Sequence, residues 1–495
     1  MIAGQSGASG NGVEHGGDGV TLVRGARFAV AWDAASGSHA YRTGIDVAFD
    51  RGGIVHVGPG YAGPAGTVIE GFGLMVMPGL VNIHAHPFSE PLNKGMWDEV
   101  GSPQLYNTSL YEYLTVLRPD AAGIRACYGV ALSELLLSGV TTLVDLSIPS
   151  EGWLDILADS GLRVCIAPMF RSGRWLTRNG HVVDYEWDEA AGLRAFDHAL
   201  RQIDLAAQHP SGRLSGMVTP AQVDTCTEGL LRDAYAESTR RAVPFQVHAA
   251  QSLSEFHEIT RRHGMTPIEW LGRLGVLGPR SIIGHGIFLD HHPWTHWQPT
   301  DDLGLLADTG TTVAHCPTVF ARRGIALNNF GRYRRAGVNM GIGTDVYPHN
   351  MLDELRLASY VGRVMAGSPR GASVGELFTA ATTGGAAALG RADIGRLAPG
   401  CRADVVLVDC THPAMRPCHD PLKSLVYSAS ERAVQHVFVD GAQVVRDGRV
   451  LTMDYPNAAA ALEEAQARAL QDIPHLDWAR RDADGIAPPA FPWAR

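Results

Sequence analysis

A pair of histidines follows a short apolar run near residue 80. The run Leu80–Ile83 comes directly after Pro78-Gly79, which is typical of a buried strand entered from a turn. Because side chains alternate along a strand, His84 and His86 are expected to point to the same side. Two imidazoles at one strand end can bind a metal ion. One such pair is a weak signal, so its meaning depends on ligands at the ends of other strands.

Further candidate ligands stand at the ends of three other apolar runs. Pro244–His248 and Ser281–His285 both end in a histidine, and the run through Gly343 and Thr344 ends in Asp345. In a barrel of parallel strands these ends meet at one face, where active sites lie. The sequence therefore predicts one metal site from five residues: His84, His86, His248, His285 and Asp345.

The segments between these residues alternate between short apolar runs and helix-length stretches, which is the pattern of repeated βα units. The expected strands are 80–84, 141–146, 163–167, 215–218, 244–248, 281–285, 312–315 and 338–344. The clearest helical patterns between them are 121–138, 190–207, 229–241 and 252–263. Eight strands fit a (β/α)8 TIM-like barrel. An open doubly wound sheet is the alternative, but no G-x-G-x-x-G fingerprint follows any of these strands.

Short alternating runs broken by glycine flank this region on both sides and predict antiparallel β-structure. Neither flank alone makes a stable sheet, so the two are expected to combine into one β-sandwich beside the barrel. The predicted organisation is a flexible tail at 1–18, a β-sandwich from 19–77 plus 396–456, a metal-dependent barrel at 78–395, and a C-terminal helix with a Pro-rich tail at 457–495.

The length, composition and charge of the chain indicate to which classes of protein it can belong. The 495 residues are too many for one ordinary core, and 45% hydrophobic with 19% charged residues describes a folded chain. The net charge of −10 gives no sign of a surface for nucleic acid or for an anionic membrane. Seven scattered cysteines without a C-x-x-C pair, no signal-peptide pattern and no membrane-length apolar stretch predict a cytoplasmic protein without a disulfide framework.

The order and spacing of the motifs resemble the amidohydrolase superfamily, in particular its cytosine deaminase-like and atrazine/triazine hydrolase-like branch. The resemblance covers roughly residues 20–450. It rests on Pro78-Gly-Leu-Val-Asn-x-His-x-His86, Gly139-Val-Thr-Thr142, Val247-His248, Gly284-His285, Val313-Ala-His-Cys-Pro317, Gly343-Thr-Asp345, Ile394–Asp404 and Val439-Asp-Gly441. It implies an enzyme with a small-molecule substrate, and relatives are commonly homodimers or larger homo-oligomers.

The resemblance also implies that His84, His86, His248 and Asp345 hold one divalent metal ion. Three neutral imidazoles and one carboxylate leave room for a water, as in open catalytic sites. Such an ion lowers the pKa of its water and supplies hydroxide as the nucleophile. Zn²⁺ is the first expectation, with Fe²⁺, Mn²⁺ or Co²⁺ as alternatives. Asp345 would be the general base, and His285 would orient the water or polarise the attacked group.

A second metal ion is not expected. Binuclear relatives need a bridging carboxylated lysine from a central strand. The chain contains two lysines, Lys94 after the first strand and Lys423 in the C-terminal segment, and neither stands on such a strand.

One position departs from the deaminase pattern. Deaminases of this branch carry His-x-x-Glu at the fifth strand, whereas this chain reads His248-Ala-Ala-Gln251. A glutamine donates and accepts hydrogen bonds but does not transfer a proton at neutral pH. Glu255 is a candidate substitute, although its spacing is off by four.

The sequence therefore favours a hydrolysis whose electrophile needs less protonation. Candidates are cleavage of an amide, urea, carbamate or thiocarbamate C–N bond, or displacement of a leaving group, on a small neutral aromatic or heterocyclic substrate. An aminohydrolase that releases ammonia from a purine-, pterin- or triazine-like ring is the alternative. A non-catalytic protein that keeps only the fold is the third hypothesis, although every ligand position is filled.

Weaker predictions concern the substrate pocket. The candidate substrate contacts are Gln251, His315, Trp97 and Asn350. Cys316 is expected to be a small buried residue rather than a nucleophile. The aromatic loop 291–297 is predicted either to cover the pocket as a lid or to pack on the barrel rim, and Lys94 either to line the mouth or to be solvated.

Overall fold

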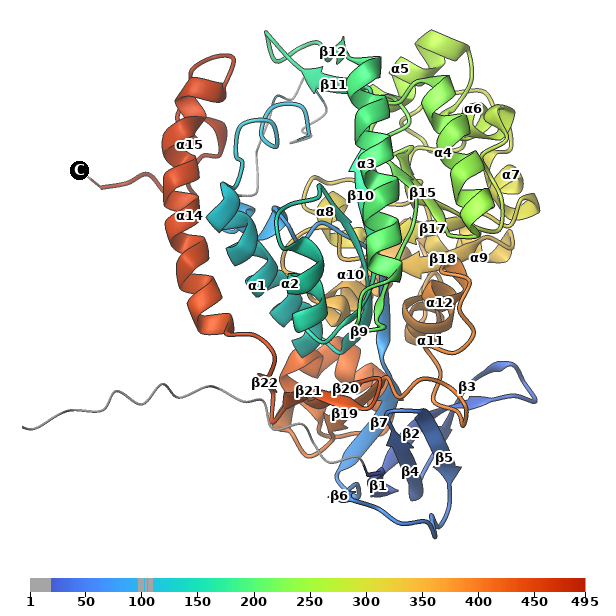
Figure 1. The fold of residues 1–495 in the computed structure, drawn as a ribbon. Coiled ribbons are helices and arrows are strands. Elements are labelled where there is room, and N and C mark those ends of the chain that lie inside the picture. Colours follow the sequence, from blue (N-terminus) through green and yellow to red (C-terminus); the bar gives the residue numbers. More distant parts are fainter. Residues whose placement is uncertain (1–18, 97–101, 103–104, 106–109, 495) are drawn as a thin grey trace, which may run out of the picture.

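The largest sheet of the protein is parallel and carries the predicted strand-end residues (Figure 1). The computed structural model describes residues 19–96, 102, 105 and 110–494, so the predicted tail at 1–18 and Trp97 lie outside the described residues. The strand order is β13-β10-β9-β8-β18-β17-β16-β15, with β14 paired to β10. The bounds are β8 (Leu80–Ala85), β9 (Val140–Ser147), β10 (Arg163–Phe170), β13 (Leu214–Gly216), β14 (Thr219–Pro220), β15 (Phe245–Ala249), β16 (Ser281–His285), β17 (Thr312–His315) and β18 (Asn339–Ile342).

The predicted fourth strand, 215–218, differs from the expectation because it is two short pieces, β13 and β14. Pro220 has no N–H to donate, which shortens the ladder here. Between the pieces, the N–H of Val218 donates to the carbonyl of Pro244 at 3.0 Å, and the N–H of Gln246 donates back to Val218 at 3.0 Å. Isolated parallel bridges, Val218 to Phe245 and Gln222 to His248, thus join the two ends of the strand order. The α/β class with a mostly parallel sheet is confirmed, while the ladder itself is not continuous at this point.

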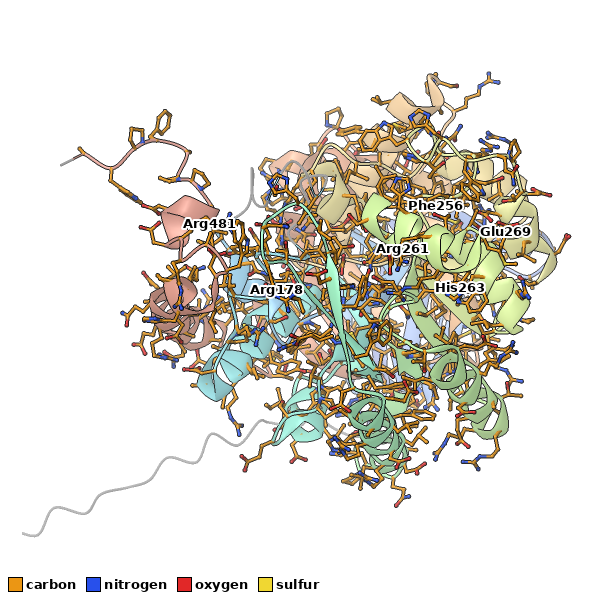
Figure 2. The ribbon with its side chains drawn as sticks, turned by 90° about the horizontal axis from the view of Figure 1, so that it is seen from above. Arg178, Phe256, Arg261, His263, Glu269 and Arg481 are labelled. Atoms are coloured by element: carbon orange, nitrogen blue, oxygen red, sulfur yellow. The ribbon has the colours of Figure 1, made fainter. Side chains whose placement is uncertain are left out.

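Helices follow most strands and cover the sheet, and the four helices predicted most clearly are all present. They are α1 (Ala121–Leu137), α3 (Glu189–Ala207), α4 (Glu228–Arg241) and α5 (Leu253–His263). Each begins at a side chain that accepts a hydrogen bond from the first turn, namely Asp120, Asp188, Thr227 and Ser252. In Figure 2, Phe256 and Arg261 of α5 lie beside Glu269 of α6 (Pro267–Leu274) on the outer side of the molecule.

Shorter elements complete this part of the chain. The further helices are η1 (Glu90–Asn93), α2 (Trp153–Asp159), α7 (Asp302–Asp308), α8 (Pro317–Ala321), α9 (Phe330–Arg335), α10 (Met351–Ala366), α11 (Val374–Thr379), η3 (Ala380–Gly384) and α12 (Gly385–Ala388). A hairpin of β11 (Gly173–Leu176) and β12 (Asp184–Trp187), which the sequence pattern did not predict, projects from the end of β10 (Figure 1).

The strands of the N- and C-terminal segments lie in two sheets, one of which contains strands from both segments. The four-stranded sheet has the order β5-β4-β1-β6 and the seven-stranded sheet β22-β21-β20-β19-β7-β2-β3. The strands are β1 (Thr21–Ala26), β2 (Phe28–Asp33), β3 (Ser38–Arg42), β4 (Ile45–Asp50), β5 (Gly53–Gly58), β6 (Thr67–Glu70), β7 (Leu74–Pro78), β19 (Val405–Asp409), β20 (Val434–Val439), β21 (Ala442–Arg446) and β22 (Arg449–Val450).

The two segments meet where β19 pairs antiparallel with β7, and buried side chains of both sheets form one cluster in which the rings of Phe49 and Phe438 lie 5.0 Å apart. The antiparallel expectation is corrected at two places, since β1 pairs with β6 and β2 with β7 in parallel. Such pairs need a long connection, which the intervening strands provide.

The C-terminal part returns to the main body. Its elements are η4 (Pro413–Met415), α13 (Pro421–Ser424), η5 (Leu425–Ala429), η6 (Ser430–Ala433), α14 (Tyr455–Leu476) and α15 (Ala483–Ile486). Helix α14 packs along α1 and buries Leu462, Ala465 and Ile473 against it (Figure 1). Arg481, labelled in Figure 2, donates to Glu112 at 3.0 Å. Among the helices of the described residues, none combines the length and apolar character that crossing a bilayer requires.

Candidate metal centre and pocket

The five predicted residues meet at the carboxyl end of the parallel sheet. Asp345 lies between the histidines, with Oδ1 3.5 Å from Nε2 of His84 and 3.3 Å from Nε2 of His86. Nε2 of His248 is 3.3 Å from Nε2 of His86. Nε2 of His285 lies 4.0 Å from the other carboxylate oxygen of Asp345. Nitrogen and oxygen atoms at this spacing can converge on one metal ion.

The outer nitrogens of three histidines are held by oxygen acceptors. Nδ1 of His84 lies 2.5 Å from Oε1 of Gln246, that of His86 lies 2.7 Å from the carbonyl of Leu146, and that of His248 lies 2.6 Å from the carbonyl of Ala221. An acceptor at Nδ1 places the proton there and leaves the Nε2 lone pair free. The three rings therefore present metal-binding nitrogens to the same point.

Two glycines and two residues with positive φ angles allow the backbone to bring these side chains together. A Cβ at Gly284 would lie 2.9 Å from Cε1 of His84, and one at Gly343 would lie 2.6 Å from Cβ of the same histidine. His285 and Asp345 have positive φ angles of 80° and 56°. Left-handed conformations of this kind are costly for residues with side chains and concentrate at functional sites. The glycines in the two strand-end motifs thus make room for His84.

Burial favours the neutral form of His86, His248 and His285, whereas the carboxyl group of Asp345 is held in its charged form. Burial lowers the pKa of His86 to about 4 and that of His285 to about 3, and it lowers the pKa of His248 well below its ordinary value. Burial alone would raise the pKa of Asp345, but the neighbouring imidazoles of His84, His285 and His86 favour its ionised form and hold this pKa well below the usual range. Neutral imidazole and ionised carboxylate are the forms that bind a metal ion.

The donor set fits a divalent metal ion. Nε2 of His84 is buried and has no hydrogen-bond partner in the described part of the chain. A buried polar atom without a partner is costly unless a ligand satisfies it. A cation held among three neutral imidazoles and one carboxylate satisfies this nitrogen and compensates the buried charge of Asp345.

A sequence model of the Amidohydrolase family matches residues 75–444, which include all five residues of the cluster. The chain belongs to the amidohydrolase family. This confirms the resemblance of its motifs and makes the protein a metal-dependent hydrolase that acts on carbon–nitrogen bonds.

Individual relatives of this amidohydrolase are deaminases and triazine-type hydrolases. It is 31% identical over 436 residues to a 5-methylthioadenosine/S-adenosylhomocysteine deaminase of Halobacterium salinarum, covering 86% of this chain and 93% of the relative. It is 29% identical over 413 residues to a 5'-deoxyadenosine deaminase of Methanothermobacter thermautotrophicus, covering 82% and 90%.

Solved structures share the fold. An adenosine deaminase from Xanthomonas campestris with bound zinc superposes with a TM-score of 0.75 at 22% identity, covering 91% of this chain and 98% of that one. The zinc complex of an atrazine chlorohydrolase from Arthrobacter aurescens has a TM-score of 0.74 at 22% identity, covering 90% and 100%.

A cavity of about 520 Å³ opens over the metal cluster of this amidohydrolase. His86, His248, His285 and Asp345 lie in its wall. The apolar part of the wall contains Phe88, Leu110, Leu114, Ile148, Met169, Trp175, Val319 and Phe320. The charged side chains that line it besides Asp345 are Glu90, Arg118, Arg171, Arg174 and Arg323. The size suits a small organic molecule.

Gln251 lies where the sequence predicted, in the wall of this cavity. Its side chain is buried and its amide nitrogen has no hydrogen-bond partner among the described residues. Glu255 is turned away from the cavity, since Oε1 accepts from the N–H of Ala250 at 2.6 Å and Oε2 accepts from the N–H of Gln251 at 3.4 Å. Glu255 therefore holds the loop that carries Gln251 and does not replace the deaminase glutamate.

Two other predicted substrate contacts, His315 and Asn350, are not in the described wall of the cavity. His315 is buried, and its ring lies 5.8 Å from that of Phe330. Asn350 is the N-cap of α10, and its Nδ2 donates to Asp353 at 2.9 Å and to Glu431 at 2.7 Å. Both ends of the Asn350 amide are therefore occupied at the start of α10. Cys316 is buried, as expected.

The aromatic loop 291–297 packs on the rim rather than over the pocket. None of its residues lies in the described wall of the cavity. The ring of His292 lies 4.7 Å from Phe288, and that of Trp297 lies 5.9 Å from Phe256. Lys94, whose side chain is 35% exposed, forms an ion pair with Glu134 and is not part of the described wall.

Sequence patterns did not point to several residues of the site. Gln246 lies two residues before His248 on the inner face of β15, so strand alternation could have indicated it. The hairpin β11–β12 carries Arg174 and Trp175 into the wall. It is fastened by buried Asp224, which accepts from Nε1 of Trp175 at 2.7 Å and from the hydroxyl of Tyr185 at 2.8 Å. No local signal linked Asp224 to this hairpin.

Proposed function

We propose that this amidohydrolase attacks an electron-poor carbon of a small heterocyclic substrate and hydrolyses a C–N bond or displaces another leaving group there. The observation that carries this is Gln251 in the wall of the cavity, at the position where deaminases of this branch hold a glutamate. A substrate whose leaving group departs without strong protonation suits such a wall.

The roles of the ligands follow from their positions. A bound divalent ion, for which zinc is proposed because two structural neighbours bind it, supplies Lewis acidity to the water or substrate oxygen next to it. His84, His86, His248 and Asp345 would hold the ion. The second oxygen of Asp345 faces His285, so Asp345 can take the proton of the attacking water while His285 orients the group under attack.

The arginine side chains in the cavity wall favour a substrate that has an anionic end or an end rich in hydrogen-bond acceptors. Arg118, Arg171 and Arg174 line it on one side. Burial and the neighbouring charge of Arg174 lower the pKa of Arg118, which indicates that these cations repel each other. An anion placed among them would relieve that repulsion.

Deamination of a purine nucleoside is the second candidate function. The named deaminases among the relatives, similar over 90% or more of their lengths, favour it. Incubation of zinc-loaded protein with amide, carbamate, alkoxy-triazine and aminopurine substrates, followed by detection of ammonia and of the other leaving groups, separates the two. Ammonia release as the fastest reaction would overturn the first candidate.

We further propose that residues 78–395 form a (β/α)8 barrel. Residues 19–77 and 396–456 would together form a β-sandwich beside it, and residues 457–495 would form a separate helical tail. The bridges between Val218 and Phe245 support the barrel, and the shared cluster around Phe49 supports the sandwich. Limited proteolysis near residues 77–79 and between residues 395 and 405, followed by identification of the fragments, would test these boundaries.

A cytoplasmic homodimer or larger homo-oligomer is the proposed working form. All seven cysteines are free, as suits a reducing compartment. Tyr360 and Val364 on α10 are 47% and 78% exposed, an apolar pair that a second copy could cover. Light scattering on wild-type protein and on Val364→Glu tests this, and an unchanged monomer in both would contradict it.

A further inference from the structure

The fifth strand does not supply the cavity with the glutamate that deaminases of this branch carry in their His-x-x-Glu motif. Gln251 stands there instead, and Glu255 is occupied by two backbone N–H groups. In the described wall of the cavity two carboxylates remain, Asp345 and Glu90. Asp345 belongs to the metal cluster, so Glu90 is the carboxyl group that a substrate can meet.

Glu90 is fixed close to the metal cluster by local structure. It begins the short helix η1, and its N–H donates to the carbonyl of His86 at 3.2 Å. This bond places Glu90 one turn after a metal ligand. The residue is 5% exposed, and Nδ2 of Asn93 donates to its Oε2 at 3.0 Å. Asn93 therefore orients the carboxyl group, and Oε1 has no bond of this kind to a described residue.

A buried carboxyl group in a largely apolar wall is costly for the fold and is typical of a functional site. Burial and the charge of Asp345 raise the pKa of Glu90 to about 8, while Asn93 and Arg323 act in the opposite direction. In either protonation state the group keeps an oxygen that accepts a hydrogen bond. A donor on the substrate would satisfy that oxygen.

We propose that Glu90 binds an N–H group at the reacting edge of the substrate, and that the ligand class is a purine-like heterocycle with such an N–H. This rests on the proposed function, because it assigns the substrate of the same site. Glu90 would then provide a carboxyl group from the segment that follows the first strand, whereas deaminases of this branch carry theirs at the fifth strand.

The test is binding of inosine, which has a ring N–H, and of 1-methylinosine, which lacks it, by calorimetry with zinc-loaded protein. Wild-type protein should bind inosine about 10- to 100-fold more tightly than its methylated form. Glu90→Met, which keeps the length but offers only a weak thioether acceptor, should bind the two nearly equally, and Glu90→Gln should retain part of the preference. Glu464→Gln on the exposed face of α14 is the matched control, and metal content should stay stoichiometric in all variants.

Other results have distinct meanings. A Glu90→Met protein that discriminates as well as wild type would overturn the role of Glu90, as would equal binding of the two nucleosides by wild type. Binding of neither nucleoside would overturn the ligand class. If Glu90→Met fails to fold, Glu90→Gln must still lose part of the preference. The wild-type protein could also prefer inosine over 1-methylinosine and yet hydrolyse none of the substrates tested above. That result would refute the proposed function but leave the binding role of Glu90 intact.

Discussion

Oε1 of Gln246 lies 2.5 Å from Nδ1 of His84, and the Nε2 of the same amide donates to the carbonyl of Ile83 at 3.2 Å. The second bond fixes the orientation of the amide, so that its oxygen faces the histidine. One uncharged side chain thereby determines which nitrogen of a metal ligand carries the proton.

Gln246→Leu should weaken metal binding by about 10- to 100-fold, since His84 would lose the acceptor that fixes its tautomer. Competition with a chromogenic chelator measures this directly. Gln208→Leu at the exposed end of α3 is the control and should bind metal like wild type. Equal affinity in the Gln246 variant would mean that the amide does not tune the ligand.

Removal of the metal ion by a chelator should abolish turnover, and added zinc should restore it. His84→Ala should lower kcat by about 10³-fold or more, because a ligand is lost from the centre of the cluster. His181→Ala, an exposed histidine, serves as the control. Full turnover of metal-free protein would exclude a metal-dependent mechanism and revive the hypothesis of a non-catalytic fold.

Gln251→Glu should raise the rate of ammonia release from aminated heterocycles by about 10-fold or more, since it places a group that transfers protons in the cavity wall. The same change should leave the displacement of good leaving groups nearly unaltered. Ammonia assays on wild type and variant measure the difference. A variant without any gain would show that Gln251 does not replace a proton shuttle.

Arg118→Gln should raise the KM for substrates with an anionic end by about 10-fold and leave kcat little changed, because a cation that binds substrate and transition state equally affects KM alone. Arg201→Gln on the exposed surface of α3 is the matched control. Initial-rate kinetics at low salt measure both. A fall in kcat with unchanged KM would contradict a role in substrate binding.

The buried carboxyl group of Asp145 should make the stability of the fold depend on pH. Burial raises its pKa from 3.8 to about 7, although Ser147 and Trp153 donate hydrogen bonds to it. The folded state therefore binds a proton that the unfolded state has released, and the free energy of unfolding falls as pH rises from about 4 to 7. Between pH 5 and 7 the group contributes a loss of about 2 kcal/mol. Asp145→Asn should flatten this slope in urea titrations, and an equally steep slope would refute it.

Much of the fold was predictable from local pattern. Leu80–Ala85 forms a buried strand because its apolar residues follow a Pro-Gly turn, and α5 begins at Ser252 because that side chain accepts from the N–H of Glu255. The hairpin β11–β12 was missed because each of its strands is only four residues long. So short a strand carries little periodic signal.

The sequence by itself determined the types and order of the metal ligands, since strand alternation and the βα repeat place His84, His86, His248 and Asp345 at one edge. Only the tertiary structure decided which other side chains share the cavity. In the folded chain Glu255 accepts hydrogen bonds from the backbone, Asn350 caps a helix, and Glu90 lies in the wall of the cavity. The reason is that the alternation of side chains along a strand and the position of its end are local, whereas a place in the cavity depends on packing between segments far apart in the chain.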